Sequence, residues 1–346
     1  GIKSLSGGFI GKASKVKEPP QDQQQRLINL YQQGQLQQAL GSAKQLLSQF
    51  PNSLTLHIIS GAVNAGLGQF DAAIGSYKQA LKIKPDYADA YYDMGVALKG
   101  KGDLEAAIGS YNKALKIKPN YAKAHNNIGS ALKDKGDLEA AIGSYKKALK
   151  IKPDYAEAYS NMGNALKRKG DLESAIDSYK QALKDKPDFV EAYYNMGNVL
   201  KDKGDLEAAI DSYKQAIKIK PDLAEAYNNM GTALNEEGDL EAAIDSYEQA
   251  IKIRPNFADA YLNMGNALKD KDDLEAAIDC YQQAIKIKPD YAEAHSNLGT
   301  ILLKLGRLEE AVASFNQAIE FKIDFPDAYN NKNLCLNYFS SGSPLF

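Results

Sequence analysis

The chain has 346 residues, and its 42 lysine and arginine residues against 44 aspartate and glutamate residues give a formal net charge of -2 at pH 7. This balance argues against nucleic acid or an anionic membrane surface as the main partner. No apolar run approaches the roughly 18 residues of a membrane-spanning helix.

Residues 1–19, GIKSLSGGFIGKASKVKEP, form an arm rich in glycine, serine and lysine. The arm has no apolar core of the kind found in a signal peptide. Because the chain begins with Gly1 rather than methionine, we expect it to have been processed or trimmed. The sequence therefore does not decide the cellular location of the protein. It is either cytoplasmic or, if the chain was processed before Gly1, extracellular.

Residues 20–53 keep part of a pattern that becomes regular later in the chain. Gly34, Leu36, Ala39 and Pro51 retain its spacing, while glutamine replaces much of the rest. A polar and atypical terminal unit is typical of the cap on a stack of repeats. We therefore expect a degenerate capping repeat here.

From Leu54 to Phe325 the chain repeats regularly, in eight units of equal length without insertion or deletion. A fixed period of about 34 residues indicates a stacked repeat architecture. Residues 326–339 follow as one further helix, and residues 340–346 form a short tail.

Each unit is predicted to contain two helices of about 13 to 14 residues, neither of which could bury its apolar stripe alone. In the third unit, Asp154 stands three residues before Glu157, which predicts a capping box at the start of the first helix. Gly170 supplies a left-handed stop, and Asp171 then caps the second helix. Asp272 replaces this glycine in a later unit, where we expect the turn to survive because aspartate tolerates the left-handed region.

Small and aromatic residues recur at positions that predict close helix packing. One glycine falls in the middle of the first helix of every unit, where it costs about 1 kcal/mol relative to alanine. We expect it wherever two helices approach too closely for a side chain, with an aromatic ring filling the gap between units. The glycines are Gly61, Gly95, Gly129, Gly163, Gly197, Gly231, Gly265 and Gly299, and the aromatic residues are Tyr77, Tyr111, Tyr145, Tyr179, Tyr213, Tyr247, Tyr281 and Phe315.

These are signature positions of the tetratricopeptide repeat (TPR) family, which the chain resembles from Leu54 to Phe325. The resemblance implies an all-α fold, a right-handed superhelix or TPR solenoid of helix-turn-helix units. It also implies a function carried by the faces of the solenoid rather than by an active site.

No constellation of residues indicates catalysis, a metal or a cofactor. His57, His125 and His295 occupy a slot that tyrosine fills in other units, so we interpret them as packing aromatics. Cys280 and Cys335 have no other ligands nearby in the sequence, and Cys280 takes a slot that serine fills in most other units. We therefore predict a protein that is not an enzyme.

A row of asparagines recurs two places before the packing glycine. A side-chain amide both donates and accepts hydrogen bonds, so evenly spaced amides could hold an extended peptide backbone with little sequence preference. Alternatively, these asparagines are a polar filler or pair with the adjacent unit. Further asparagines, such as Asn126, Asn198 and Asn228, are expected to enrich the same surface. The members of the row are Asn127, Asn161, Asn195, Asn229, Asn263, Asn297 and Asn331.

The row resembles the superhelix of the O-linked N-acetylglucosamine transferases, in which inner-face asparagines hold the substrate peptide. The segment AYNNKNLCLNY, residues 328–338, is similar to the helix that joins the repeats to the catalytic domain in bacterial members of that family. The resemblance implies peptide binding along the concave face, with a catalytic domain lying outside this chain.

Two hypotheses follow. The first is an interaction scaffold that binds an extended peptide or partner protein along its asparagine-rich face. The second is a structural protein that assembles head to tail into a fibril, because near-identical units present near-identical end faces. In that case the terminal arm and tail are docked on the next subunit. The candidate assembly contacts are the apolar residues Phe9, Ile10, Leu334, Leu336, Tyr338, Phe339, Leu345 and Phe346.

Overall fold

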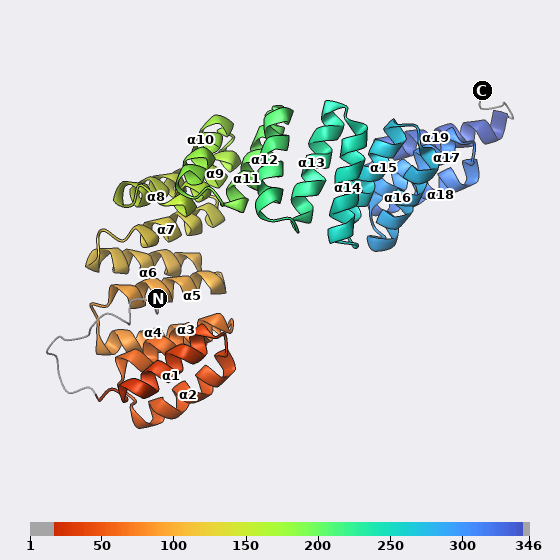
Figure 1. Cartoon of the computed structure of the whole chain (residues 1–346). Coiled ribbons are helices and arrows are strands. Elements are labelled where there is room, and N and C mark those ends of the chain that lie inside the picture. Colours follow the sequence, from red (N-terminus) through yellow and green to blue (C-terminus); the bar gives the residue numbers. More distant parts are fainter. Residues whose placement is uncertain (1–16, 342–346) are drawn as a thin grey trace. The chain divides into compact units, whose positions relative to one another are not determined.

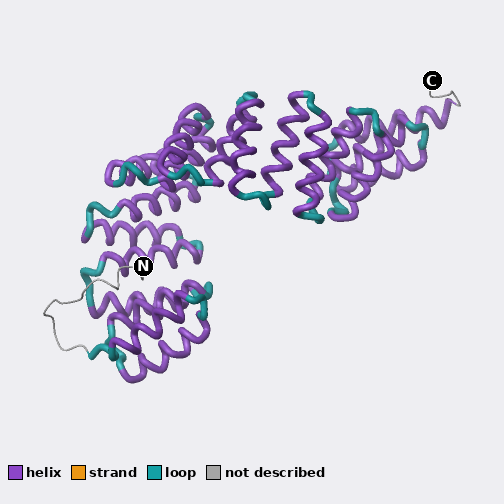
Figure 2. Tube along the Cα trace, in the orientation of Figure 1, coloured by secondary structure: helices purple, strands orange, loops and turns teal. Residues whose placement is uncertain are grey.

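The computed structural model describes residues 17–341 and, among these, the side chains up to Tyr338. Within this range the chain is made of α-helices and short connections, without a strand (Figure 2). The helices are α1 (Gln21–Gln32), α2 (Leu36–Gln49), α3 (Leu54–Gly66), α4 (Phe70–Ile83), α5 (Ala88–Lys101), α6 (Leu104–Ile117), α7 (Ala122–Lys135), α8 (Leu138–Ile151), α9 (Ala156–Lys169), α10 (Leu172–Asp185), α11 (Val190–Asp202), α12 (Leu206–Ile219), α13 (Ala224–Glu237), α14 (Leu240–Ile253), α15 (Ala258–Asp270), α16 (Leu274–Ile287), α17 (Ala292–Lys304), α18 (Leu308–Phe321) and α19 (Pro326–Ser341).

The helices fall into two compact units, one ending at Asp185 and the other beginning at Lys186. Unit 1 contains α1–α10 and unit 2 contains α11–α19. Inside each unit, consecutive helices pack side by side in pairs, and each pair packs on the next one along the chain (Figure 1). The predicted all-α solenoid of helix-turn-helix units is therefore confirmed.

The turn between α9 and α10 is built as predicted. Gly170 adopts a left-handed backbone conformation with φ of +88°. Its N–H donates to the carbonyl oxygen of Lys167 at 3.0 Å, and the N–H of Asp171 donates to that of Leu166 at 3.0 Å. The Asp171 carboxylate then accepts the N–H of Ser174 at 3.1 Å, which caps α10.

The turn after α15 keeps this geometry without glycine. Asp272 has φ of +64°, and it is the one residue other than glycine with positive φ in the described part of the chain. Its N–H donates to the carbonyl oxygen of Lys269 at 3.0 Å. The expectation that aspartate would adopt the left-handed conformation is confirmed.

The predicted capping box at the start of α9 is wrong. Tyr155 rather than Asp154 precedes the first helical residue, and no side chain accepts a hydrogen bond from this helix end. The aromatic residue instead packs with a lysine, since Lys152 Nζ lies 4.9 Å from the centroid of the Tyr155 ring. Asp154 lies in the turn, one residue too early for the cap position.

The packing glycines meet aromatic rings. A Cβ atom added to Gly129 in α7 would lie 2.7 Å from Cε1 of Tyr145 in α8, closer than real Cβ contacts allow. Tyr145 is fully buried, so its ring has little room to move away. The predicted close approach is confirmed, with one correction: the ring packs against the glycine of its own helix pair rather than only between successive pairs.

The start of the described chain is fixed to the second helix pair. Ser53 accepts the N–H of Leu56 at 3.1 Å and so caps α3. The carboxylate of Glu18 accepts the N–H of Leu54 at 2.9 Å and the hydroxyl of Ser53. The last residues of the predicted arm are therefore part of the fold.

Candidate functional site

The asparagine row lies along the first helices of successive pairs. An offset of two residues is about 200° around a helix, so each asparagine faces away from the second helix of its own pair, against which the glycine packs. All seven side chains are partly accessible. Unit 1 carries Asn127 and Asn161, and unit 2 carries Asn195, Asn229, Asn263, Asn297 and Asn331.

In unit 2, Asn229 contacts the preceding helix pair through its side-chain amide. Its Nδ2 donates to the hydroxyl oxygen of Tyr194 at 3.1 Å and to Oδ1 of Asn198 at 2.9 Å. The hydroxyl of Tyr213 donates to the same Asn198 oxygen at 2.8 Å. The packing tyrosine and two asparagines therefore form one hydrogen-bonded cluster.

The next members of the row repeat this contact. Asn263 Nδ2 donates to Oδ1 of Asn228 at 3.0 Å, and Asn297 Nδ2 donates to Oδ1 of Asn266 at 2.8 Å. Asn331 makes a long contact of 3.5 Å with the pair before it. Asn229, Asn263 and Asn297 are thus oriented by a partner from the preceding helix pair, whereas Asn195 makes no hydrogen bond within the described residues.

Unit 1 follows the same rule. Asn127 Nδ2 donates to the hydroxyl oxygen of Tyr92 at 3.0 Å, and Asn161 Nδ2 donates to Oδ1 of Asn126 at 3.1 Å. Asn126 and its counterpart Asn228 are each 7% exposed. The expectation that these two enrich the accessible surface is therefore wrong, because they lie beneath it as hydrogen-bond partners.

These contacts agree with the alternative in which the row pairs with the adjacent unit, but in three members of the row they use only part of the amide. Within the described residues, Oδ1 of Asn161, Asn263 and Asn297 accepts no hydrogen bond. An amide held by one N–H, with its oxygen and second N–H unpaired, can still bind a peptide group.

Sequence analysis missed one residue of the row. Asp93 in α5 stands exactly one repeat before Asn127 and takes its place in the preceding pair. The carboxyl is partly buried, and this burial raises its pKa to about 6. The fixed period alone would have identified this position as the acidic member of the row.

The histidines and cysteines have packing environments. His295 Nε2 lies 2.9 Å from the carbonyl oxygen of Pro289, and its ring centroid is 5.7 Å from that of Phe321. Cys280 and Cys335 are buried, and burial raises the pKa of the Cys280 thiol to about 12. Within residues 17–341 no group of three or more His, Cys, Asp or Glu side chains gathers as a metal site.

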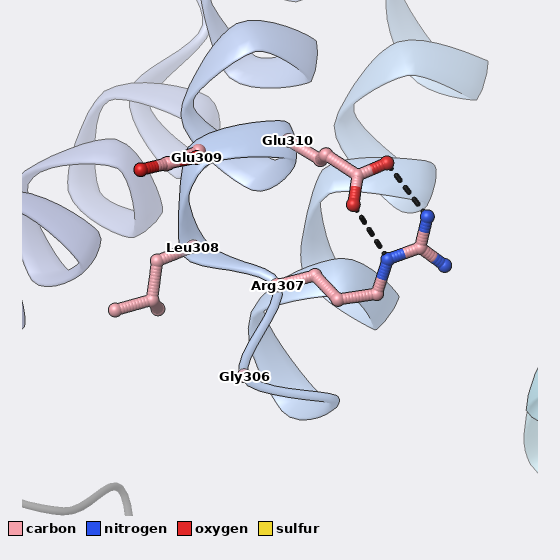
Figure 3. Close-up of a pocket in the computed structure, with 5 residues that line it drawn as sticks. All are labelled: Gly306, Arg307, Leu308, Glu309 and Glu310. Carbon is pink, nitrogen blue, oxygen red and sulfur yellow. Dashed lines mark hydrogen bonds and ion pairs between the residues drawn. The ribbon is translucent and has the colours of Figure 1, made fainter.

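A small concavity lies at the turn between α17 and α18 (Figure 3). Arg307 donates through Nε and a terminal nitrogen to the two carboxylate oxygens of Glu310, at 2.7 and 2.6 Å. The guanidinium and carboxylate therefore satisfy each other. None of the residues predicted from the sequence lines this concavity.

The candidate assembly contacts differ in their exposure, and some lie outside the described residues. In α19, Leu334 and Leu336 are each 44% exposed, whereas Cys335 between them is fully buried. Tyr338 is partly buried against the core formed with α17 and α18. Phe9, Ile10, Leu345 and Phe346, and the side chain of Phe339, lie outside what the structure describes.

None of the helices within residues 17–341 has the length and apolar character needed to cross a membrane.

Family models match most of the chain. The model described as TPR repeat matches residues 65–102, 100–136, 129–170, 163–204, 197–234, 231–272 and 265–306. Two models described as tetratricopeptide repeat match residues 292–325 and 27–53. A comparison with curated protein sequences gave no significant match.

Solved structures with similar folds include other repeat proteins. The crystal structure of MamA is 33% identical, with a TM-score of 0.45, and the match covers 46% of this chain and 94% of MamA. YrrB, described as a TPR protein with an unusual peptide-binding site, is 28% identical with a TM-score of 0.47, covering 53% of this chain and 95% of YrrB. The Cut9–Hcn1 complex is 16% identical with a TM-score of 0.54, covering 87% of this chain and 59% of the matched one, and supports the fold alone.

Proposed function

The chain belongs to the tetratricopeptide repeat family, and from this premise we propose that it is an interaction scaffold whose asparagine row binds an extended segment of a partner protein. TPR proteins bind proteins or peptides and are generally not catalytic. The proposal places binding on the first helices, where the amides recur once in each pair. No chemical step on the bound partner is required.

One observation carries this proposal: the amides are partly accessible and already oriented. Asn263 and Asn297 each hold the preceding pair through Nδ2, while within the described residues their Oδ1 atoms accept no hydrogen bond. A side chain fixed before binding loses less conformational entropy on forming a new hydrogen bond. Regular spacing of such amides suits an extended backbone, whose own N–H and C=O groups recur regularly.

The test uses a fluorescein-labelled peptide of twelve alternating serine and glutamine residues, which has no charged or aromatic side chain. Replacing Asn195, Asn229 and Asn263 with alanine is expected to weaken binding at least tenfold, because a net hydrogen bond contributes about 0.5–1.5 kcal/mol. Fluorescence anisotropy measures the affinity, and far-ultraviolet circular dichroism checks that helicity is kept. Asn316→Ala is the matched control, since Asn316 is exposed on the second helix of its pair. Undiminished affinity in the triple variant would contradict the proposal.

A second candidate function is head-to-tail self-assembly, and the outer side of α19 favours it. Leu334 and Leu336 are exposed on one side of α19, while the other side of this helix packs on the core of unit 2. Exposed leucines on a terminal repeat would be covered if another subunit stacked there. The partner surface in this candidate function is the N-terminal end of a second copy.

Light scattering with negative-stain imaging tests this second candidate. Growth into fibres with rising concentration is expected, and Leu334→Ser with Leu336→Ser should abolish it. Deleting residues 1–16 or 340–346 is expected to do the same, and a cut after residue 16 leaves the Glu18 contacts with α3 in place. A discrete monomer, or fibres unchanged by all three alterations, would remove self-assembly from consideration.

A further inference from the structure

Helix α5 in unit 1 presents a face that differs from the rest of the asparagine row (orange in Figure 1). Asp89, Tyr92, Asp93 and Val96 recur at three- and four-residue spacing, so they share one side of the helix. The first three are partly accessible and Val96 is 42% exposed. The face therefore combines carboxylates, an aromatic ring and an apolar side chain.

The carboxylate of Asp93 is not neutralised by a direct contact. Within residues 17–341 it has no hydrogen bond and no ion pair. Asp89, one turn earlier on α5, is a like charge, while the exposed Lys123 on α7 acts only across a distance. Desolvation raises the pKa of Asp93 to about 6, so above that pH this partly buried negative charge has no paired cation among the described residues.

Tyr92, the residue before Asp93, belongs to a cluster of aromatic rings. The Tyr92 and Tyr121 ring centroids are 5.0 Å apart, and Tyr92 lies 5.8 Å from Tyr111. The hydroxyl of Tyr121 donates to Asp89 at 2.8 Å, which ties the second ring to the acidic face. Lys118 Nζ lies 4.4 Å from the Tyr121 centroid, so one face of that ring already holds a cation. Burial is the main cause of the raised pKa of Tyr92 and Tyr121, and the negative charge of Asp93 raises the pKa of both further.

A second observation comes from beneath the face. The hydroxyl of Tyr111 is buried and has no hydrogen-bond partner in the described part of the chain, because the nearby amide of Asn127 donates to a different hydroxyl. In unit 2 the corresponding Tyr213 donates to Asn198, but α5 carries Val96 in that slot. Where unit 2 has the amide of Asn198 bonded to Tyr213, the α5 pair has the apolar side chain of Val96, and the hydroxyl of Tyr111 has no partner within the described residues.

We propose that the face formed by Asp89, Tyr92, Asp93 and Val96 binds a lysine or arginine side chain of the extended partner segment. The carboxylate of Asp93 pairs with the cationic head, and the electron-rich face of Tyr92 adds a cation–π contact. Val96 covers the aliphatic stem, as apolar surface does for long basic side chains. This inference rests on the proposed function, because it selects which peptide the asparagine row holds.

Unit 2 contains a natural comparison for this site. Tyr194 corresponds to Tyr92 and lies 6.2 Å from Tyr213, and it accepts a hydrogen bond from Asn229 as Tyr92 does from Asn127. Its neighbour, however, is Asn195 rather than an aspartate. The contacts of the two tyrosines are thus similar, whereas the aspartate beside the tyrosine is present on α5 and replaced by asparagine on α11.

The experiment compares two labelled twelve-residue peptides of serine and glutamine, identical except that residue six is lysine in one and glutamine in the other. The full chain is expected to bind the lysine peptide about tenfold more tightly at pH 7.5, a ratio typical of one charge-assisted contact. Asp93→Asn should remove that preference, so that the lysine and glutamine peptides bind the variant with equal affinity. The variant restores the asparagine found in this slot of the later pairs, so the fold is expected to be kept.

Asp154→Asn is the matched control, because it removes the same charge from an exposed turn of unit 1. It should keep the lysine preference. Equal binding of the two peptides, or a preference that survives Asp93→Asn, would overturn this inference and leave the asparagine row as the binding surface. Binding of neither peptide at millimolar concentration would overturn both proposals.

Discussion

Two glycine-to-alanine changes in one helix pair are expected to shift stability in opposite directions. Gly129 in α7 faces the buried ring of Tyr145, and an added Cβ would lie 2.7, 2.8 and 2.9 Å from three of its ring atoms. Gly143 in α8 is exposed, and an added Cβ would meet nothing within 4 Å. Both glycines lie inside helices, so the backbone argument is the same for each.

The magnitudes follow from two opposing terms. Alanine gains up to about 1 kcal/mol over glycine in a helix interior, and Gly143→Ala should show most of this gain. Gly129→Ala gains the same amount but forces a ring that is 0% exposed to move, and overpacking of this kind typically costs about 1–3 kcal/mol. The net expectation is a loss of up to about 2 kcal/mol.

The assay is urea denaturation of the full chain, followed by circular dichroism at 222 nm. Wild type and the two single variants are compared by their midpoints and by fits that allow helix pairs to unfold separately, as suits a repeat protein. A Gly129→Ala variant as stable as Gly143→Ala would refute the argument that close helix approach selects the glycine.

Two further predictions concern a cap and a buried charge. Asp171→Ala should cost about 1 kcal/mol, because the N–H of Ser174 loses its acceptor; the urea midpoint measures this, and Asp154→Ala should have little effect. The pKa of Asp93 is raised in the folded chain from 3.8 to about 6, so its favourable contribution is fully present below about pH 4 and is lost as the pH rises through 6. Asp93→Asn should therefore stabilise the chain relative to wild type at pH 8 and less so at pH 4.5, as measured by thermal unfolding, and a difference that does not depend on pH would contradict the assigned pKa.

Replacing Asp93 is expected to affect peptide binding and folding stability in opposite directions. A partly buried carboxylate without a partner costs stability, and such a cost is tolerated where the group serves a ligand. Asp93→Asn is therefore expected to gain stability while losing the preference for lysine. This opposite effect on folding and binding distinguishes a binding residue from one that only supports the fold.

The sequence by itself determined the repeat, the helix pairs and the close packing within them. The repeat length can be read directly from the sequence. The left-handed turn at Gly170 and the cap at Asp171 are local features, because they depend on the residues at those positions. Glycine in mid-helix is costly, so its recurrence at positions such as Gly129 predicted a close approach of two helices, while the structure placed the ring of the same pair against it.

Only the tertiary structure decided how one pair meets the next. The partners of Asn229 and Asn263 lie in the preceding pair, and which of them an amide reaches depends on how the packed helices are oriented. Tyr155 takes the N-cap position of α9 without a capping hydrogen bond, and its ring lies against Lys152. Only the structure likewise showed that Asp93 is partly buried and has no ion pair within the described residues, because exposure and pairing are properties of packing rather than of sequence spacing.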